Sequence, residues 1–306
     1  MIGTRTRATV SRYRGQILLV GLALGLLLGV HASIGRVGSI APEDLPGATR
    51  TIEAAVLLLL GQLSVGYAWR RLAPTLDDPV TSMWTFHATQ PGKYLPLGVG
   101  QAVGQVALAR SAGLPTRTAM GAWASLLAMI VGSGVTVGAL VVLVPRDGTS
   151  RWLGLIGLAG ALVVYRPFLH GLIGFGARFS KRLPAAEDLP SQRSLLEAFV
   201  ACAVFVVLDG CAFALLLGTG TGGGVLAGTI GAYALAVGIS TATPLPAGLG
   251  VRELLLVLFT DAGTAPVITA SIVLRVTVFA VEVALLVGFS TVRQVRAIRS
   301  AGDPDG

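Results

Sequence analysis

The chain has 306 residues, of which 53% are hydrophobic and only 12% are charged, and its mean hydropathy is +0.77. So apolar a composition excludes a soluble domain of this length and predicts an all-α polytopic membrane protein. The net charge of +8 comes from basic residues beside apolar runs, which is the pattern of topology signals, so we expect no nucleic-acid partner.

Residues 1–15 contain four arginines and precede an apolar run over residues 16–35. Basic flanks of this kind stay in the cytoplasm, so we expect a cytoplasmic N-terminus and a first spanning helix. The alternative is a secretory signal cleaved after Ala32, so whether residues 1–32 are retained stays open.

A second span is predicted over residues 52–69, and its polar side chains Glu53, Gln62 and Ser64 should face protein rather than lipid. The following residues, 74–90, are less apolar and lead into Leu-Pro-Leu-Gly-Val-Gly at 95–100. Proline removes a backbone donor and glycine relaxes a helix, so two short helices in a re-entrant hairpin are expected there.

Spans over 119–144 and 152–174 follow, joined by an outer turn at 145–148, and residues 175–194 form a cytoplasmic loop. The remaining chain repeats the plan with a span at 195–217, an apolar segment at 225–241, a second broken segment and a last span at 267–289. Fifteen of the 23 lysines and arginines fall on the proposed cytoplasmic side and four outside. We therefore expect both termini in the cytoplasm, with 36–48 and 145–151 outside, in the cell membrane.

The motif Leu-Pro-x-Gly-x-Gly at 95–100 recurs 150 positions later at 245–250, and Gly113 and Gly263 keep the same register. The chain therefore reads as a single transmembrane domain made of two similar halves, 1–150 and 151–306. Paired interrupted segments are typical of a transporter's midplane binding site. The expected hinge residues are Pro96, Gly98, Gly100, Pro246, Gly248 and Gly250.

The parity of the predicted crossings gives the two halves opposite orientations, which is an inverted repeat. The sequence thus predicts about eight helical segments, two of them broken or re-entrant.

Several charges lie within apolar stretches: Lys93, Arg166, Arg252, Arg275, Glu197, Asp209, Glu253 and Glu282. Each costs roughly 2.5 to 3.5 kcal/mol at the bilayer centre, so together they predict a polar cavity lined by protein. Arg252 follows Gly250, where the second helical half should begin, and a helix N-terminus with an arginine favours an anion. Arg275 and Glu282 share one face of the last span. The alternatives are a structural Arg/Glu network, and for Arg166 an extension of the side chain to the interface.

No nucleophile elbow, phosphate-binding loop or metal-ligand spacing is present, and the cysteines, Cys202 and Cys211, stand on opposite faces of one predicted helix. We therefore expect no enzymatic activity, no cofactor and no metal.

The segments at 92–115 and 243–259 resemble the two signature regions of the lysylphosphatidylglycerol synthase transmembrane-region family, which includes the flippase part of the bacterial multiple peptide resistance factor. The matching residues are Lys93, Tyr94, Pro96, Pro246, Gly248, Gly250, Arg252 and Glu253. The resemblance implies a bundle of about eight helices that moves a lipid or lipid-linked sugar between leaflets. This chain departs from the pattern at Gln101-Ala102, where charged residues are usual, and it lacks a soluble aminoacyl-transferase domain.

We expect a flippase-like membrane protein for an anionic phospholipid or a polyprenyl-phosphate-linked glycan. The predicted substrate-binding residues are Lys93, Tyr94, Arg252, Glu253, Arg275 and Glu282. The alternatives are a proton-coupled transporter of a small anion, with Glu253 or Glu282 as the carrier, and a non-catalytic scaffold. Expected partners are a glycosyltransferase or lipid-synthesis enzyme and a second copy of the chain.

Overall fold

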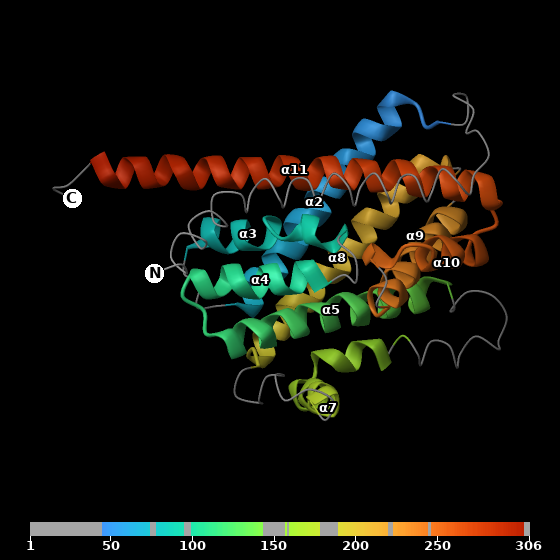
Figure 1. Ribbon diagram of the computed structural model, residues 1–306. Helices are drawn as coiled ribbons and strands as arrows, with labels where there is room; N and C mark the ends of the chain where they lie inside the picture. Colours follow the sequence, from blue (N-terminus) through green and yellow to red (C-terminus); the bar gives the residue numbers. More distant parts are fainter. Residues whose placement is uncertain are drawn as a thin grey trace, which may run out of the picture.

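The computed structural model describes residues 45–73, 78–94, 99–142, 157, 159–177, 189–219, 223–243 and 246–302. The predicted first span and the outer turn at 145–148 lie outside these residues. The described part is helical and contains no strand (Figure 1). In chain order the elements are α2 (Ala48–Leu72), α3 (Pro79–His87), the 3-10 turn η2 (Gln90–Tyr94), α4 (Val99–Ser111), α5 (Thr116–Val142), η3 (Leu162–Val164), α7 (Arg166–Ala177), α8 (Gln192–Leu217), α9 (Gly223–Thr241), η5 (Pro246–Gly248), α10 (Val251–Phe259) and α11 (Thr264–Gly302).

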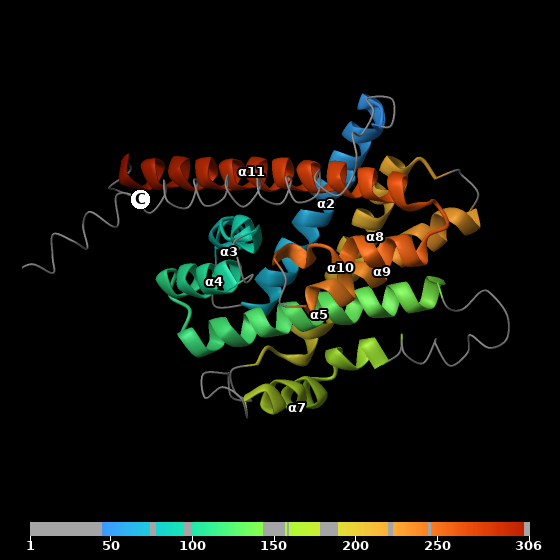
Figure 2. The same cartoon turned by 45° about the vertical axis from the view of Figure 1, so that its right-hand side comes forward.

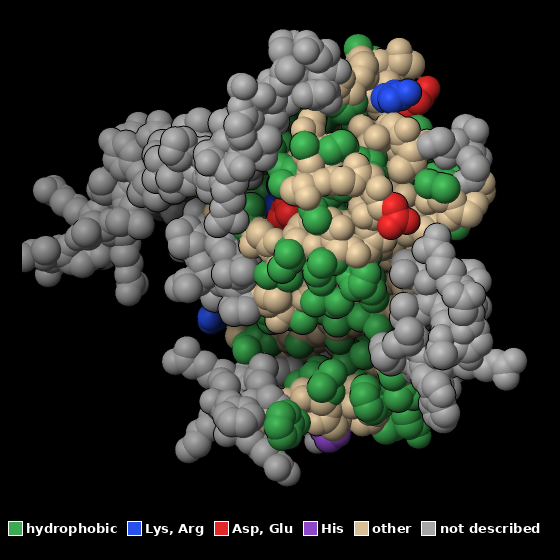
Figure 3. Space-filling view, turned by 90° about the vertical axis from the view of Figure 1, so that its right-hand side faces the viewer, with side chains coloured by type: hydrophobic (Ala, Val, Ile, Leu, Met, Phe, Trp, Pro, Cys, Tyr) green, Lys and Arg blue, Asp and Glu red, His purple; other side chains and the backbone are tan. Residues whose placement is uncertain are grey.

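Five of these helices, α2, α5, α8, α9 and α11, are long and apolar enough to cross a membrane. Their outer faces carry large exposed apolar side chains such as Ile52, Val200 and Val276. Figure 3 shows one face of the molecule, on which hydrophobic side chains form a broad area and charged ones are few. Such a surface matches acyl chains rather than water.

Helices α2 and α8 cross antiparallel at the centre of the bundle. Ser64 Oγ donates to the carbonyl of Ala201 at 2.9 Å, and Gly61 lies against Asp209 on the next turns of the two helices. In Figure 1 the two helices run diagonally through the bundle, and Figure 2 shows the same course of α2 from a second side. A glycine at this crossing allows close approach of the helices, because a Cβ on Gly61 would lie 2.6 Å from Asp209 Oδ1.

Each broken segment packs on a long helix from elsewhere in the chain. In the second broken segment (α9, η5 and α10), α9 lies antiparallel to α5, where Gly134 and Gly138 meet Gly238 and Leu235 at close range. In the first (α3, η2 and α4), α3 lies antiparallel to α11, with Trp84 Nε1 donating to Ser290 Oγ at 3.1 Å. The long helix that follows one broken segment therefore supports the other.

The backbone leaves helical geometry at the second broken segment. Ala247, Gly248 and Gly250 have φ values of 48, 65 and 81°. Such values favour glycine, and at Ala247 they place a side chain in the left-handed region. At the first broken segment, Pro96 and Gly98 lie outside the described residues, and Gly100 stands in the first turn of α4.

The two broken segments differ in length. The first arm of the second segment, α9, has 19 residues and is long enough to span, whereas α3 has nine. Glycines with positive φ occupy equivalent sequence positions after the second arms: Gly113, at 100°, lies in the turn that closes α4, and Gly263, at 78°, directly precedes α11. The sequence repeat therefore keeps a glycine with positive φ after each second arm, although the turns in which the two glycines stand differ.

The predicted continuous span over 152–174 is wrong. Gly157 and Gly160 do lie along α5, where Thr136 Oγ1 donates to the Gly157 carbonyl at 2.9 Å. The helix is interrupted at Tyr165, which is extended, and α7 begins again at Arg166. Pro167 disfavours a continuous helix through this point, because it has no amide hydrogen to donate to the carbonyl four residues earlier and its ring would clash with that carbonyl.

A side chain from α8 satisfies the backbone groups that this interruption releases. Gln192 accepts from the Arg166 amide at 3.0 Å and donates to the Val164 carbonyl at 2.7 Å.

Among the polar residues of the second span, Gln62 is buried and Ser64 is bonded to α8 as expected, but Glu53 is exposed. Glu53 stands in the second turn of α2, near the end of the helix, where a long side chain can reach a polar environment. The expectation that Glu53 faces protein is therefore wrong.

Candidate functional site

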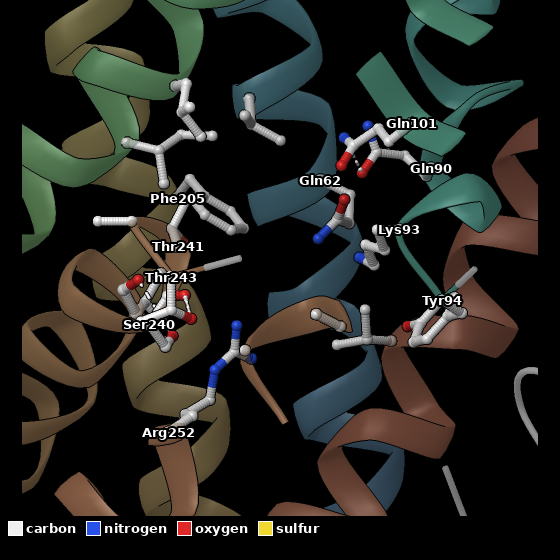
Figure 4. Close-up of a pocket in the computed structure, with 18 of the residues that line it drawn as sticks. Gln62, Gln90, Lys93, Tyr94, Gln101, Phe205, Ser240, Thr241, Thr243 and Arg252 are labelled. Carbon is white, nitrogen blue, oxygen red and sulfur yellow. Dashed lines mark hydrogen bonds between the residues drawn. The ribbon is translucent and has the colours of Figure 1, made fainter. Parts of the chain in front are cut away.

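The broken segments and the central helices enclose a cavity of about 410 Å³. Its walls come from α2, α3, η2, α4, α5, α8, α9, η5, α10 and α11, so most of the fold contributes to it (Figure 4). Four of the predicted substrate-binding residues line it: Lys93, Tyr94, Arg252 and Arg275.

Three basic side chains line the cavity, and no aspartate or glutamate of the described residues does. Arg252 is in the first turn of α10, and its guanidinium lies 5.9 Å from the centre of the Tyr233 ring. Its Nε is buried and has no hydrogen-bond partner in the described part of the chain. Figure 4 shows the Arg252 guanidinium between Ser240 and Thr243 on one side and Gln62 and Lys93 on the other.

The predicted residue Glu253 does not line the cavity but pairs with a residue that does. Its Oε1 accepts from Arg275 Nε at 2.9 Å and from Arg275 Nη2 at 2.6 Å. Its Oε2 accepts from the amide of Gly250 at 2.8 Å, which satisfies a free donor at the start of α10. Glu253 therefore neutralises Arg275 and fixes the position of Arg252 beside it.

Glu282 neutralises Lys93 in the same way. The Lys93 ammonium forms an ion pair with Glu282, whose side chain is fully buried on α11. Lys93 also lies 5.3 Å from the centre of the Tyr94 ring, and Tyr94 packs edge-on against Phe279. Two of the three cations of the cavity thus have a carboxylate partner, and the third, Arg252, has no ion pair within the described ranges.

Sequence reasoning did not assign the uncharged polar groups to the site, although it expected Gln62 to face protein. One wall carries the amides of Gln62, Gln90 and Gln101, and Gln101 donates to Gln90 at 3.3 Å. Another carries hydroxyl groups, among them Ser240 and Thr243. Gln90 and Ser240 stand 150 positions apart, so the repeat itself contained a signal for this pair.

The rest of the wall is apolar and aromatic, and includes Phe86, Trp123, Phe205, Val237 and Leu274. The cavity is therefore amphipathic: cations and amides on some sides, hydrocarbon on the others. A pocket of this kind suits a ligand with an anionic head and an apolar body.

Two further charges of the apolar stretches lie elsewhere. Asp209 is buried between α8 and α2, and its Oδ1 has no hydrogen-bond partner among the described residues. Arg166 is exposed, does not line the cavity, and contacts the Leu189 carbonyl at 3.4 Å through Nη2. Within the described ranges, no three His, Cys, Asp or Glu side chains are placed to hold a metal ion.

The described part of the chain is thus helical, with five helices long and apolar enough to cross a membrane and a charged cavity inside the bundle, as in polytopic membrane proteins. Comparison of the sequence with protein-family models and with curated proteins found no match. The resemblance carried by residues 92–115 and 243–259 therefore stays a prediction.

Proposed function

We propose that this protein moves an anionic amphiphile, either a phospholipid or a polyprenyl-phosphate-linked glycan, between the leaflets of a membrane. The observation that carries the proposal is the cation set of the cavity, Lys93, Arg252 and Arg275, without a carboxylate on the same walls in the described part of the chain. A phosphate or another anion is the natural partner of such a set.

Arg252 supplies the charge for the ligand. Glu282 and Glu253 offset the charges of Lys93 and Arg275, so the cavity keeps one cation free to bind an anion. The position of Arg252 at the start of α10 adds the helix dipole and the amides of the first turn. Arginine also offers a planar pair of donors, which matches two phosphate oxygens better than lysine does.

The other walls of the cavity favour an amphiphile over a small solute. Phe86, Trp123, Phe205 and Leu274 offer hydrocarbon contact on the cavity side. The amides of Gln62, Gln90 and Gln101 provide donors and acceptors for the hydroxyl groups of a glycerol or sugar. A free inorganic anion would leave the apolar surface unused.

The packing of the broken segments supports an inverted repeat. The relation of α3 to α11 corresponds, in the 150-residue register, to that of α9 to α5. Ser111, at the end of α4, and Asp261, just after α10, are both exposed and occupy equivalent positions of the repeat. In a cysteine-free background, we expect Ser111→Cys to be labelled only from the cytoplasm and Asp261→Cys only from outside. Labelling of both positions from one side would refute the opposite orientation.

The function is tested by reconstitution into vesicles that contain fluorescent phosphatidylglycerol. We expect Arg252→Gln to lower the rate of translocation about tenfold or more, because loss of one charged hydrogen-bonding group costs roughly 1.5 to 3 kcal/mol. Arg252→Lys should recover part of the rate. The matched control is Arg193→Gln on the exposed end of α8, which should leave the rate unchanged. Wild-type rates in Arg252→Gln would contradict the proposal.

Two further arms separate the alternatives. Uptake of radiolabelled inorganic phosphate into the same vesicles tests a transporter of small anions. If neither lipid translocation nor phosphate uptake exceeds that of empty vesicles, and Arg252→Gln and Glu253→Gln both unfold the protein, the charges serve only to hold the bundle together.

A further inference from the structure

A buried carboxylate that the proposed anion site does not use lies next to the cavity. Asp209 is 3% exposed, on the membrane-spanning helix α8, and its Oδ1 has no hydrogen-bond partner in the described part of the chain. An ionised carboxylate in such a place carries a large desolvation cost. Groups of this kind in spanning helices are typically functional and take up or release protons.

The other acids of the apolar stretches are all paired. Glu253 binds Arg275, Glu282 binds Lys93, and Glu197 binds Arg71 and Arg193. A proton added to any of them would have to break an ion pair. Asp209 has no such pair among the described residues, so its protonation breaks no direct contact.

The position of Asp209 connects it to the cavity. Phe205, one turn earlier on α8, lines the cavity, and both side chains face Gly61 of α2. Gln62, the next residue on α2, also lines the cavity. Asp209 and Arg252 are close enough to interact electrostatically. Asp209 is therefore the distant counter-charge of the one cavity cation that lacks an ion pair in the described ranges.

We propose that Asp209 is a proton-binding site coupled to the anion site, so that the protein takes up one proton for each anion it binds. The inference rests on the proposed function, because it needs an anion at Arg252. In the empty cavity, at a pH where Asp209 is ionised, Arg252 offsets part of the charge of its carboxylate. A bound anion takes over Arg252, and two negative charges then face each other in a medium of low dielectric. Protonation of Asp209 removes that repulsion.

The charged groups around Asp209 come from three elements. Arg252 on α10 and Lys93 on η2 favour the ionised form, whereas Glu282 on α11 opposes it. Tyr233 on α9 is the remaining titratable group that interacts with Asp209. Glu282 and Lys93 offset each other as an ion pair, so Arg252 is the group whose occupation by an anion changes the balance most.

The sign of the coupling follows from linkage. If binding takes up a proton, affinity for the anion rises as pH falls through the titration of Asp209. With one proton per anion, the dissociation constant of the anion falls about tenfold for each unit by which the pH falls in that window. A phosphodiester keeps one negative charge over this range, so the protons that are counted come from the protein.

The test uses the full chain in detergent and dihexanoyl phosphatidylglycerol as the probe. Titration calorimetry in buffers of different ionisation enthalpy counts the protons taken up on binding. Over a series of pH values, the uptake by wild type should reach close to one where Asp209 is ionised in the empty protein, whereas Asp209→Asn should bind the probe without uptake and with a dissociation constant that does not change with pH. The matched control is Glu197→Gln, near the N-terminal end of the same helix, which should behave like wild type.

Each result decides something different. Binding without proton uptake in wild type, or equal uptake in Asp209→Asn, overturns the proton site and leaves the anion site standing. Failure of wild type to bind the probe refutes the proposed function and this inference with it. If Asp209→Asn does not fold, infrared difference spectra of wild type decide: the band of a protonated carboxyl should appear when the probe binds, and its absence overturns the proposal.

Discussion

Arg275 and Glu282 lie two turns apart on one face of α11, and each forms an ion pair with a different broken segment. Arg275 pairs with Glu253 of α10, and Glu282 pairs with Lys93 of η2. Their separation along the helix is about 10 Å. One face of α11 therefore holds two walls of the cavity in place, and a change at either pair should alter the geometry around Arg252.

The pair between Glu253 and Arg275 is testable by a double-mutant cycle. Glu253→Gln removes the charge but keeps an oxygen that can accept from the Gly250 amide. Because Arg275 is then largely buried without a counter-ion, we expect a loss of about 3 kcal/mol in the free energy of unfolding. Glu253→Gln with Arg275→Gln should lose less than the sum of the single changes. Strictly additive losses, measured by denaturant unfolding in micelles, would contradict a direct pair.

The pair between Lys93 and Glu282 should behave asymmetrically. Lys93→Met leaves the fully buried Glu282 without its cation, which costs about 3 kcal/mol or more. Glu282→Met leaves Lys93 facing a polar cavity, so the loss should be smaller. The double variant should recover most of the thermal stability, because two apolar side chains then replace the pair. A double variant as unstable as Lys93→Met would show that packing, not charge, sets the effect.

The contact between α5 and α9 depends on the absence of side chains. A Cβ on Gly138 would lie 2.7 Å from the Leu235 amide nitrogen, so Gly138→Ala must push the helices apart. We expect it to lower stability by about 1 to 3 kcal/mol. Gly228→Ala on α9 is the control, since no atom lies within 4 Å of the added carbon and alanine favours a helix. Thermal melts in which both variants lose equally would refute the close contact.

Asp78 should give α3 a stability that depends on pH. Its carboxylate accepts from the Thr81 amide at 2.8 Å and pairs with Arg296 of α11 at 2.9 Å. Partial burial alone would raise the pKa of Asp78, but the hydrogen bonds from Thr81 and Val80 and the charge of Arg296 outweigh it, so the pKa is lowered.

A lowered pKa means that the stabilisation by Asp78 is complete above its ordinary pKa of 3.8 and is lost as the pH falls through the folded value. Asp78→Ala should therefore melt at a lower temperature than wild type at pH near 7, because loss of the helix cap lowers the free energy of unfolding by about 1 kcal/mol. The difference should shrink when melting is measured below the ordinary pKa. An unchanged difference at low pH would show that the cap acts without its charge.

Much of the fold follows from patterns along the chain. The apolar runs at 52–69 and 195–217 coincide with α2 and α8, because a hydrophobic stretch of that length has only one stable backbone form in lipid. The span predicted over 152–174 was wrong because Pro167 was passed over, although a proline inside a helix removes a backbone hydrogen bond and clashes with the preceding turn. For the candidate site, the charged residues were found in sequence, since a charge in an apolar run is conspicuous, and the amides and hydroxyls were not.

The sequence by itself determined the class of fold, the position of the interruption in the second broken segment and the list of charges that a bilayer would not accept unpaired. It could not say which charges meet. Glu253 and Arg275 are 22 positions apart, and Lys93 and Glu282 are 189 positions apart. Asp209, on α8, interacts electrostatically with Arg252 without a direct contact in the described ranges. Only the tertiary structure paired two cations and left Arg252 and Asp209 without direct partners in the described ranges. The physical reason is that hydrophobicity and backbone strain act locally along the chain, whereas electrostatic pairing depends on distances that helix packing alone sets.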